Sequence, residues 1–132
     1  MTTSSTALTL QPSQLARLTQ IDYDREMAFI AVRRRSDGSD ETLGVVRGVA
    51  DPDNDKAEFA IIIRSDLKGM GLGHILMDKL VAYFRQRGTR QIVGEALSDN
   101  RPMIELMHEL GFSVRSKVGE GTVELTLDLS TI

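Results

Sequence analysis

Alternating apolar and polar positions mark several segments of the chain as strands. The clearest lies near the C-terminus, where residues 123–129 place valine or leucine at every second position, as half-buried antiparallel strands do. Residues 27–32 and 42–50 predict two more strands, and the Asp37-Gly38 pair between them predicts a hairpin turn.

The segment Glu58–Arg64, EFAIIIR, has a continuous apolar centre instead of an alternating one. Such a run is typical of a strand that is covered on both faces and therefore lies in the middle of a sheet. Residues 91–97 predict a further strand, and another begins at Phe112.

Apolar residues at helical spacing predict three helices. The strongest pattern lies between Gly71 and Gly88, with charged residues on the opposite side. A second helix follows Asn100, a residue suited to an N-cap, and ends at Gly111. A short first helix is predicted over residues 12–20.

The predicted order is helix, three strands, helix, strand, helix and two strands. Antiparallel hairpins with inserted helices indicate an α+β fold and not a doubly wound parallel sheet. The length of 132 residues favours one domain over residues 1–132. Residues 1–11 are rich in Ser and Thr and are expected to be disordered.

The amino-acid composition excludes several kinds of functional site. The chain has no cysteine, which excludes disulfides, thiolate zinc sites and a cysteine nucleophile, and its two histidines, His74 and His108, do not make a metal site. A net charge of −3 gives no case for nucleic-acid binding. The sequence shows no leader peptide and no apolar run of membrane-spanning length, so we expect a cytoplasmic protein without a membrane partner.

Three glycines, Gly69, Gly71 and Gly73, stand directly before the strongest helix. They either make a tight strand-to-helix turn or allow an anion to approach the helix N-terminus, where backbone N–H groups and the helix dipole favour negative charge. The spacing fits neither a P-loop nor the dinucleotide fingerprint of Rossmann folds.

The stretch KGMGLG, from Lys68 to Gly73, resembles the acetyl-CoA motif of the GNAT acetyltransferases, with Lys68 where the family has Arg or Gln. The stretch NRPMIELMHELGF, from Asn100 to Phe112, is similar to another segment of that family. The likeness runs from about Asp22 to Leu129. Within the family, the chain looks like the C-terminal GNAT domain of bacterial protein lysine acetyltransferases.

The resemblance implies a GNAT fold, with a central, mixed, mostly antiparallel sheet and helices on both faces. The chain starts near the family's second helix, so the usual first strand and helix are expected to be missing. The resemblance also implies acetyl-CoA as cosubstrate, no metal, and a lysine amine as acceptor, on a protein such as an acyl-CoA synthetase. Oligomeric state stays open.

The same resemblance assigns site residues. It places the catalytic base at Glu58. It places acetyl-CoA against the preceding strand, the glycine loop and the start of the last helix. The residues implied in cofactor binding are Ile61, Ile62, Ile63, Lys68, Gly69, Met70, Gly71, Leu72, Gly73, His74 and Asn100.

Each assignment has a plainer alternative. Glu58 could be an exposed strand-end carboxylate, and Glu95 is a second acidic candidate near the acceptor. Asn100 could serve as N-cap, as acetyl-CoA contact, or as both. His74 could contact a phosphate or be an exposed first-turn histidine. Met107 stands where many GNAT enzymes carry an acidic tyrosine, so no general acid is expected there.

Three functions follow from the sequence. The first is acetyl-CoA-dependent acetylation of a protein lysine. The second is a non-catalytic module that binds acyl-CoA and regulates a partner. The third is a GNAT enzyme that acetylates a small-molecule amine.

Overall fold

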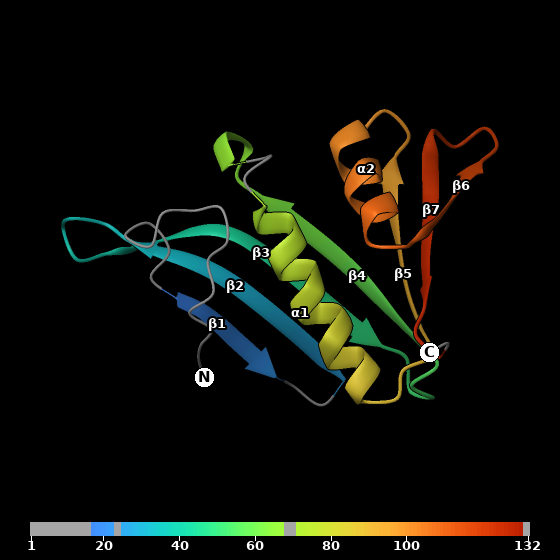
Figure 1. Ribbon diagram of the computed structural model, residues 1–132, viewed down its shortest axis with the longest axis horizontal. Coiled ribbons are helices and arrows are strands. Elements are labelled where there is room, and N and C mark those ends of the chain that lie inside the picture. The colour runs from blue at the N-terminus through green and yellow to red at the C-terminus, as the bar shows by residue number, and fades with distance from the viewer. Residues whose placement is uncertain (1–16, 23–24, 68–70, 131–132) are drawn as a thin grey trace.

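The computed structural model describes residues 17–22, 25–67 and 71–130. In this part of the chain, one sheet of seven strands is joined by two α-helices and one 3-10 turn (Figure 1). The strands run in the order β1-β2-β3-β4-β5-β7-β6 across the sheet. Their bounds are β1 Arg17–Asp22, β2 Glu26–Arg34, β3 Asp40–Ala50, β4 Lys56–Ile63, β5 Gln91–Leu97, β6 Ser113–Lys117 and β7 Thr122–Asp128. The helices are α1 Leu72–Gln86 and α2 Arg101–Glu109, and the 3-10 turn η1 covers Ser65–Leu67.

The predicted first helix is wrong in its described part, because Arg17–Asp22 forms strand β1. This strand pairs antiparallel with β2 along its whole length. A short isolated helix is marginal in water, whereas a strand gains a full ladder of hydrogen bonds from its neighbour, so the tertiary context overrides the local signal. Residues 12–16 of that prediction lie outside the described residues, as do residues 1–11.

The mixed, mostly antiparallel sheet expected from the sequence is confirmed. All neighbouring strands are antiparallel except β4 and β5, which are parallel. The other predicted strands and the two longer helices are present, with ends shifted by a few residues. None of the helices in the described residues is long and apolar enough to cross a bilayer.

Both described helices lie on the same face of the sheet (Figure 1). Phe84 of α1 lies against Gly48 of β3, and Phe112, just after α2, stacks on Phe59 of β4. Gly48 and Phe59 are paired across β3 and β4, so their side-chain directions share one face. The helix expected on the other face is therefore not among the described residues.

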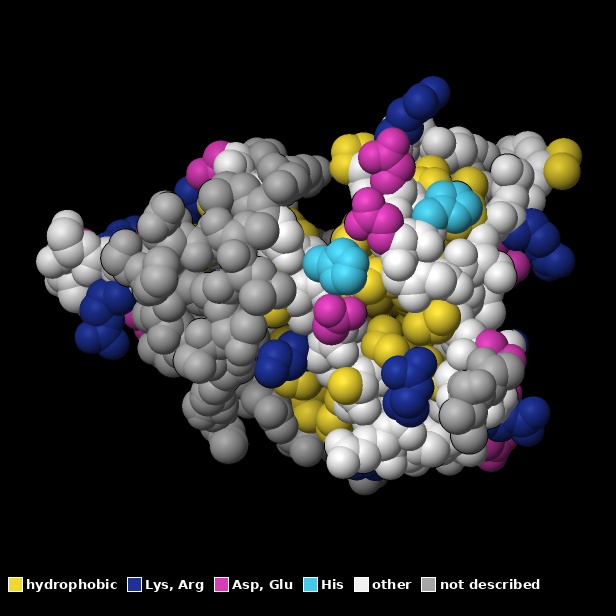
Figure 2. Space-filling view, in the orientation of Figure 1, with side chains coloured by type: hydrophobic (Ala, Val, Ile, Leu, Met, Phe, Trp, Pro, Cys, Tyr) yellow, Lys and Arg dark blue, Asp and Glu magenta, His cyan; other side chains and the backbone are white. Residues whose placement is uncertain are grey.

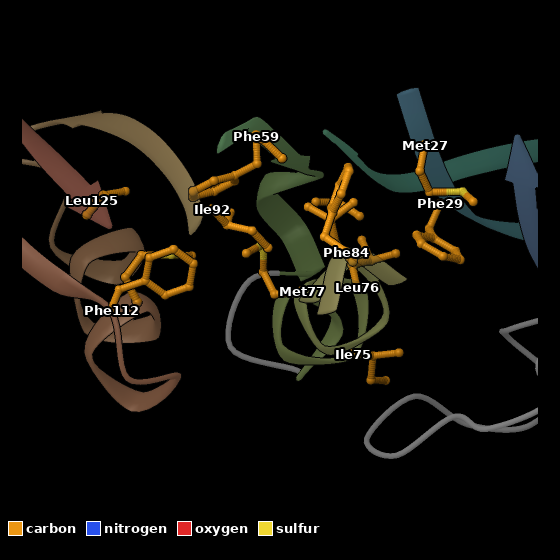
Figure 3. Packing of buried hydrophobic residues seen from close by; sticks show 14 of the residues in the cluster. Met27, Phe29, Phe59, Ile75, Leu76, Met77, Phe84, Ile92, Phe112 and Leu125 are labelled. Atoms are coloured by element: carbon orange, nitrogen blue, oxygen red, sulfur yellow. The ribbon is translucent and has the colours of Figure 1, made fainter. Parts of the chain in front are cut away.

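The core is continuous along this face. Figure 3 shows Phe84 and Leu76 of α1 next to Phe29 of β2, and Phe59 next to Ile92 of β5. From there the buried cluster continues through β7 and the segment that follows α2. The helix-side apolar pattern of α1 is confirmed, because every predicted core position is buried. These positions are Leu72, Ile75, Leu76, Leu80 and Phe84.

Strand β4 is central, as predicted, but the prediction that both its faces are covered is wrong. Ala57 and Phe59 are buried, whereas Glu58 and Ala60 are exposed and Ile62 is 74% exposed. An apolar run shows that a strand is central but not what covers each face, since side chains alternate between faces. Among the described residues, nothing buries the face that carries Ile62.

Candidate active site

Strands β4 and β5 run together at one end and separate towards the other (Figure 1). They pair over only three positions, from Lys56 with Gln91 to Glu58 with Val93. Beyond Val93, β5 continues its pairing with β7 to Leu97, so β5 turns away from β4 and stays regular. The end of β4 therefore has a β-sheet partner on its β3 side only.

The separation leaves polar backbone groups of β4 without a strand partner. The N–H of Arg64 donates to the carbonyl of Leu43 in β3 (3.0 Å). Because successive residues of an antiparallel strand direct these groups to opposite edges, the N–H and C=O of Ile61 and Ile63 point to the β5 side. An extended amide-containing ligand could pair with them as a missing strand would.

A cavity of about 520 Å³ lies where the two strands have separated. One wall is the end of β4, another is the start of α1, and the third is α2. Figure 2 shows this face of the molecule, with acidic and histidine side chains gathered over α1 and α2. The lining residues are Ile61, Ile62, Ile63, Leu67, Gly71, Gly73, His74, Asn100, Pro102, Met103, Glu105, Leu106 and Glu109.

The N-terminus of α1 opens into this cavity without a side-chain cap. Gly71 is the N-cap residue, with φ 86° and ψ −2°, and it makes no side-chain cap hydrogen bond. The first turn also carries no acidic residue. The positive φ favours glycine, and the N–H groups of the first turn and the positive end of the helix dipole suit an anion.

Gly73 serves a different purpose from Gly71. A Cβ atom built on Gly73 would lie 2.9 Å from Cδ2 of Leu106 and 3.0 Å from Cδ1 of Ile63. Gly73 is buried and lets the first turn of α1 approach both α2 and β4. The glycines thus make a tight turn and a close contact, and they also leave the helix end open. Lys68, Gly69 and Met70 lie outside the described residues.

Asn100 does cap α2. Its Oδ1 accepts from the backbone N–H of Met103 (3.3 Å), and Pro102 near the helix start lacks an N–H that would need a partner. Asn100 also lines the cavity, so the residue that caps α2 is part of the candidate site as well. Its contact with acetyl-CoA stays a prediction.

Two other residues that were predicted to bind acetyl-CoA, His74 and Leu72, lie differently with respect to the cavity. His74 lines the cavity, and its Nδ1 lies 3.3 Å from Oδ2 of Asp78, one turn further along α1. Leu72 is 1% exposed and packs into the core, so only its backbone could face a ligand.

The acidic candidates lie apart from the cavity wall. Glu58 is exposed and is not a lining residue, and it shares its face of β4 with Ile62, which is one. Three residues separate Glu58 from Ile61, or about 10 Å along an extended strand. Glu95 is held by Lys117, whose Nζ lies 2.5 Å from Oε2.

Sequence reasoning missed most of the α2 wall. Met107, singled out because it replaces a tyrosine, is fully buried, and the cavity is instead lined by its neighbours Met103, Glu105, Leu106 and Glu109. Their spacing of three to four residues marks one helix face. That face could have been identified once α2 was known to lie beside the end of β4. In the described part of the chain, no three acidic or histidine side chains are arranged to hold a metal ion.

Comparison with known proteins agrees with this geometry. Residues 4–112 match the model of the acetyltransferase (GNAT) family. The chain is 36% identical over 101 residues to "Acetyltransferase PA5475" of Pseudomonas aeruginosa, which covers 76% of this chain and 54% of that protein. The chain thus spans about half the length of this curated relative.

Solved structures share the fold. The GNAT domain of S. lividans PAT has a TM-score of 0.65 and 25% identity, over 79% of this chain and 61% of that one. The structure of yncA from Salmonella typhimurium with its cofactor acetyl-CoA has a TM-score of 0.65 and 22% identity, over 81% and 66% of the two chains. The match to the family model covers most of the sequence, and the separated β4 and β5 strands bound a cavity at an open helix end. The chain belongs to the acetyltransferase (GNAT) family.

Proposed function

We propose that this chain is an acetyl-CoA-dependent N-acetyltransferase whose acceptor is a lysine amine on a protein. One observation carries the proposal: the unpaired edge of β4 and the uncapped N-terminus of α1 border the same cavity. Membership of the GNAT family supports acetyl-CoA as the ligand that binds both the edge of β4 and the N-terminus of α1. A pantetheine arm offers amides to the strand edge, and a pyrophosphate offers negative charge to the helix end.

Each end of the ligand would meet suitable groups. The segment Lys68–Gly73 would hold the pyrophosphate, with Gly71 allowing close approach to the backbone. The backbone of Ile61–Ile63 would pair with the pantetheine arm. A backbone N–H there would donate to the thioester carbonyl oxygen, which gains negative charge as the amine attacks.

The transfer itself exchanges one bond for another. The amine nitrogen forms a bond with the acetyl carbon and then releases a second proton, while the carbon–sulfur bond breaks and the thiolate leaves with the electron pair and takes up a proton to become the thiol. Before attack, the ammonium must give up a proton, and we assign its acceptor as Glu58. Because Glu58 is outside the cavity lining, we expect the proton to reach it through water. The thiol, with a pKa near 8.5 if cysteine is a guide, can leave without a dedicated acid.

The first experiment is calorimetric titration of the chain with acetyl-CoA, with ADP and NADH as comparison ligands. We expect micromolar binding that is selective for acetyl-CoA. Absence of binding by a folded chain would contradict the proposal. Binding without acetylation of either protein lysines or small amines would favour the non-catalytic module.

Glu58 is tested by the Glu58→Gln variant, with Glu95→Gln as the matched control on the neighbouring strand. We expect Glu58→Gln to lower kcat by about 10²–10⁴-fold, the usual contribution of a general base. Its affinity for acetyl-CoA should be unchanged. A kcat of Glu58→Gln equal to that of the unmodified chain would remove Glu58 from the mechanism, and a loss of kcat in Glu95→Gln alone would move the role of base to Glu95.

The acceptor is tested by comparing turnover on lysine-containing peptides with turnover on polyamines and other small amines. The small-molecule alternative has the same cavity and the same acetyl donor, so only the acceptor separates it from our proposal. Preference for a free small amine would overturn the protein-lysine assignment and leave acetyl transfer intact.

A further inference from the structure

Arg64 is the junction between β4 and the turn that leads to the helix N-terminus. Its backbone N–H donates to the carbonyl of Leu43 in β3, and its own carbonyl accepts from the N–H of Leu67 in η1, both at 3.0 Å. The chain therefore leaves the sheet at a residue whose backbone is fixed on both sides.

The side chain of Arg64 makes a second set of connections across the same junction. Its Nε donates to Oδ1 of Asp66 (3.0 Å) and its Nη2 to Oδ2 (2.6 Å), a two-pronged contact that fixes the plane of the guanidinium. Its Nη1 donates to Oε2 of Glu41 in β3. One side chain thus ties η1 to the neighbouring strand.

Glu41 is a suitable anchor, because its side chain is only 13% exposed and is held from several directions. Arg33 of β2 donates to Oε1 (2.9 Å), and Nη2 of Arg35 lies 3.8 Å from Oε2. The hydrogen bonds from Arg33 and then Arg64 keep the pKa of Glu41 below its ordinary value. The hydrogen bond from Arg64 likewise lowers the pKa of Asp66. Arg64 thus contacts two carboxylates, and its Nε, Nη1 and Nη2 each already donate to a carboxylate oxygen within the protein.

The turn that Arg64 holds forms part of the cavity. Leu67, the last residue of η1, is 5% exposed and lines the cavity wall next to Ile63. Gly71, four positions further along the sequence, is the N-cap residue of α1 and lines the same cavity. A shift of η1 would therefore move the cavity wall at Leu67.

We propose that Arg64 is a positioning residue for the phosphate-bearing half of acetyl-CoA, acting through its contacts with Glu41 and Asp66. It holds η1 against β3 and so fixes the cavity wall at Leu67, which lines the same cavity as Gly71 at the start of α1. This inference rests on the proposed function. It differs from a role in phosphate binding, because the guanidinium is occupied by carboxylates.

The test compares Arg64→Lys and Glu41→Gln with Glu26→Gln. Lysine keeps the charge of Arg64 but cannot make the two-pronged contact with Asp66. Glu26 is the matched control, because it makes the same kind of ion pair between β2 and β3, with Arg47, at the opposite end of the two strands. Among the hydrogen bonds and ion pairs of the described residues, Glu26 has none with η1 or with a residue that lines the cavity.

Two acetyl donors separate positioning from general destabilisation. Acetyl-CoA carries the pyrophosphate, whereas S-acetylpantetheine carries the same thioester and arm without phosphates. KM and kcat for both donors are measured for each variant, together with calorimetric affinity for acetyl-CoA and thermal unfolding. For each variant, the ratio of KM for acetyl-CoA to KM for S-acetylpantetheine reports how the phosphate-bearing half of acetyl-CoA contributes to binding.

We expect Arg64→Lys to raise KM for acetyl-CoA by roughly tenfold or more, in line with the loss of a group that orients a ligand-binding element. Glu41→Gln should act in the same direction. For both variants kcat at saturation and KM for S-acetylpantetheine should match the control. Loss of folding in both Arg64→Lys and Glu41→Gln would overturn the inference. An equal rise in KM for acetyl-CoA and for S-acetylpantetheine would also overturn it. Either result would show that the contacts of Arg64 stabilise the fold in general and do not position the phosphate-bearing half.

Failure of the inference is distinguishable from failure of the proposed function. If the unmodified chain binds acetyl-CoA and the variants behave as Glu26→Gln does, Arg64 has no positioning role, and the proposed function stands. If the unmodified chain does not bind acetyl-CoA, both fall together.

Discussion

At the scale of single residues, two glycines within strands make room for aromatic rings of the core. A Cβ atom on Gly48 of β3 would lie 2.5 Å from Cε2 of Phe84, and one on Gly94 of β5 would lie 2.4 Å from Cε1 of Phe59. Neither position needs the conformational freedom of glycine, since neither has a positive φ. Glycine is needed there because a large ring occupies the space above the strand.

We expect Gly48→Ala to lower the free energy of unfolding by about 1–3 kcal/mol, the usual cost of an extra methyl group in a filled core. The cost should be smaller in a Phe84→Leu background, where the ring is gone. Chemical denaturation of both single variants and the double variant measures this coupling. Additive effects would show that the ring and the glycine are not in competition. Affinity for acetyl-CoA should change little, because neither residue lines the cavity.

At the scale of elements, the strand-to-helix connection combines a backbone requirement with a binding requirement at Gly71. The αL conformation of Gly71 starts α1, and the same residue borders the cavity. A valine at Gly71 would test both requirements at once, because a β-branched residue is strained at positive φ. Asparagine adopts this conformation more readily and still adds a side chain.

The Gly71→Asn variant should therefore lose acetyl-CoA affinity at least tenfold while its thermal unfolding stays close to that of the unmodified chain. The Gly71→Val variant should lose both affinity and stability. Calorimetry and thermal melts on the two variants give this comparison. An asparagine variant that binds acetyl-CoA normally would mean that Gly71 serves the turn alone.

At the scale of the whole molecule, the sheet consists of two ladders joined over a short stretch. β1 to β4 form one ladder, β5 to β7 form the other, and only three residue pairs of β4 and β5 connect them. Helix α1 covers the first ladder, α2 lies beside β6, and Gly73 lets α1 approach Leu106 of α2. Ligand seated between the ladders would add backbone contacts to the edge of β4.

Hydrogen exchange should report this directly. The amides of Ile61 and Ile63 point to the open edge and should exchange quickly in the free chain. Saturating acetyl-CoA should slow them, whereas the amide of Ile62, which points towards β3, should already be protected and change little. Equal protection of all three amides by acetyl-CoA would indicate general stabilisation and not a contact with the strand edge.

The sequence by itself determined strands β2 to β7, the two longer helices and the glycine-rich connection. These features depend on local spacing, on turn residues and on the apolar faces that the spacing creates. The resemblance to the GNAT family also pointed to many residues that line the cavity, among them Ile61–Ile63, Gly71, Gly73 and Asn100.

Tertiary structure alone decided the rest, because it depends on which elements become neighbours. Pairing with β2 made a strand of Arg17–Asp22, where local signals favoured a helix. The separation of β5 from β4 opened the cavity at the end of β4. The contact of Arg64 with Glu41 joins residues 23 positions apart, and no spacing rule predicts it. Local patterns specify elements, whereas the open edge, the cavity and this ion-pair network arise only when the elements pack together.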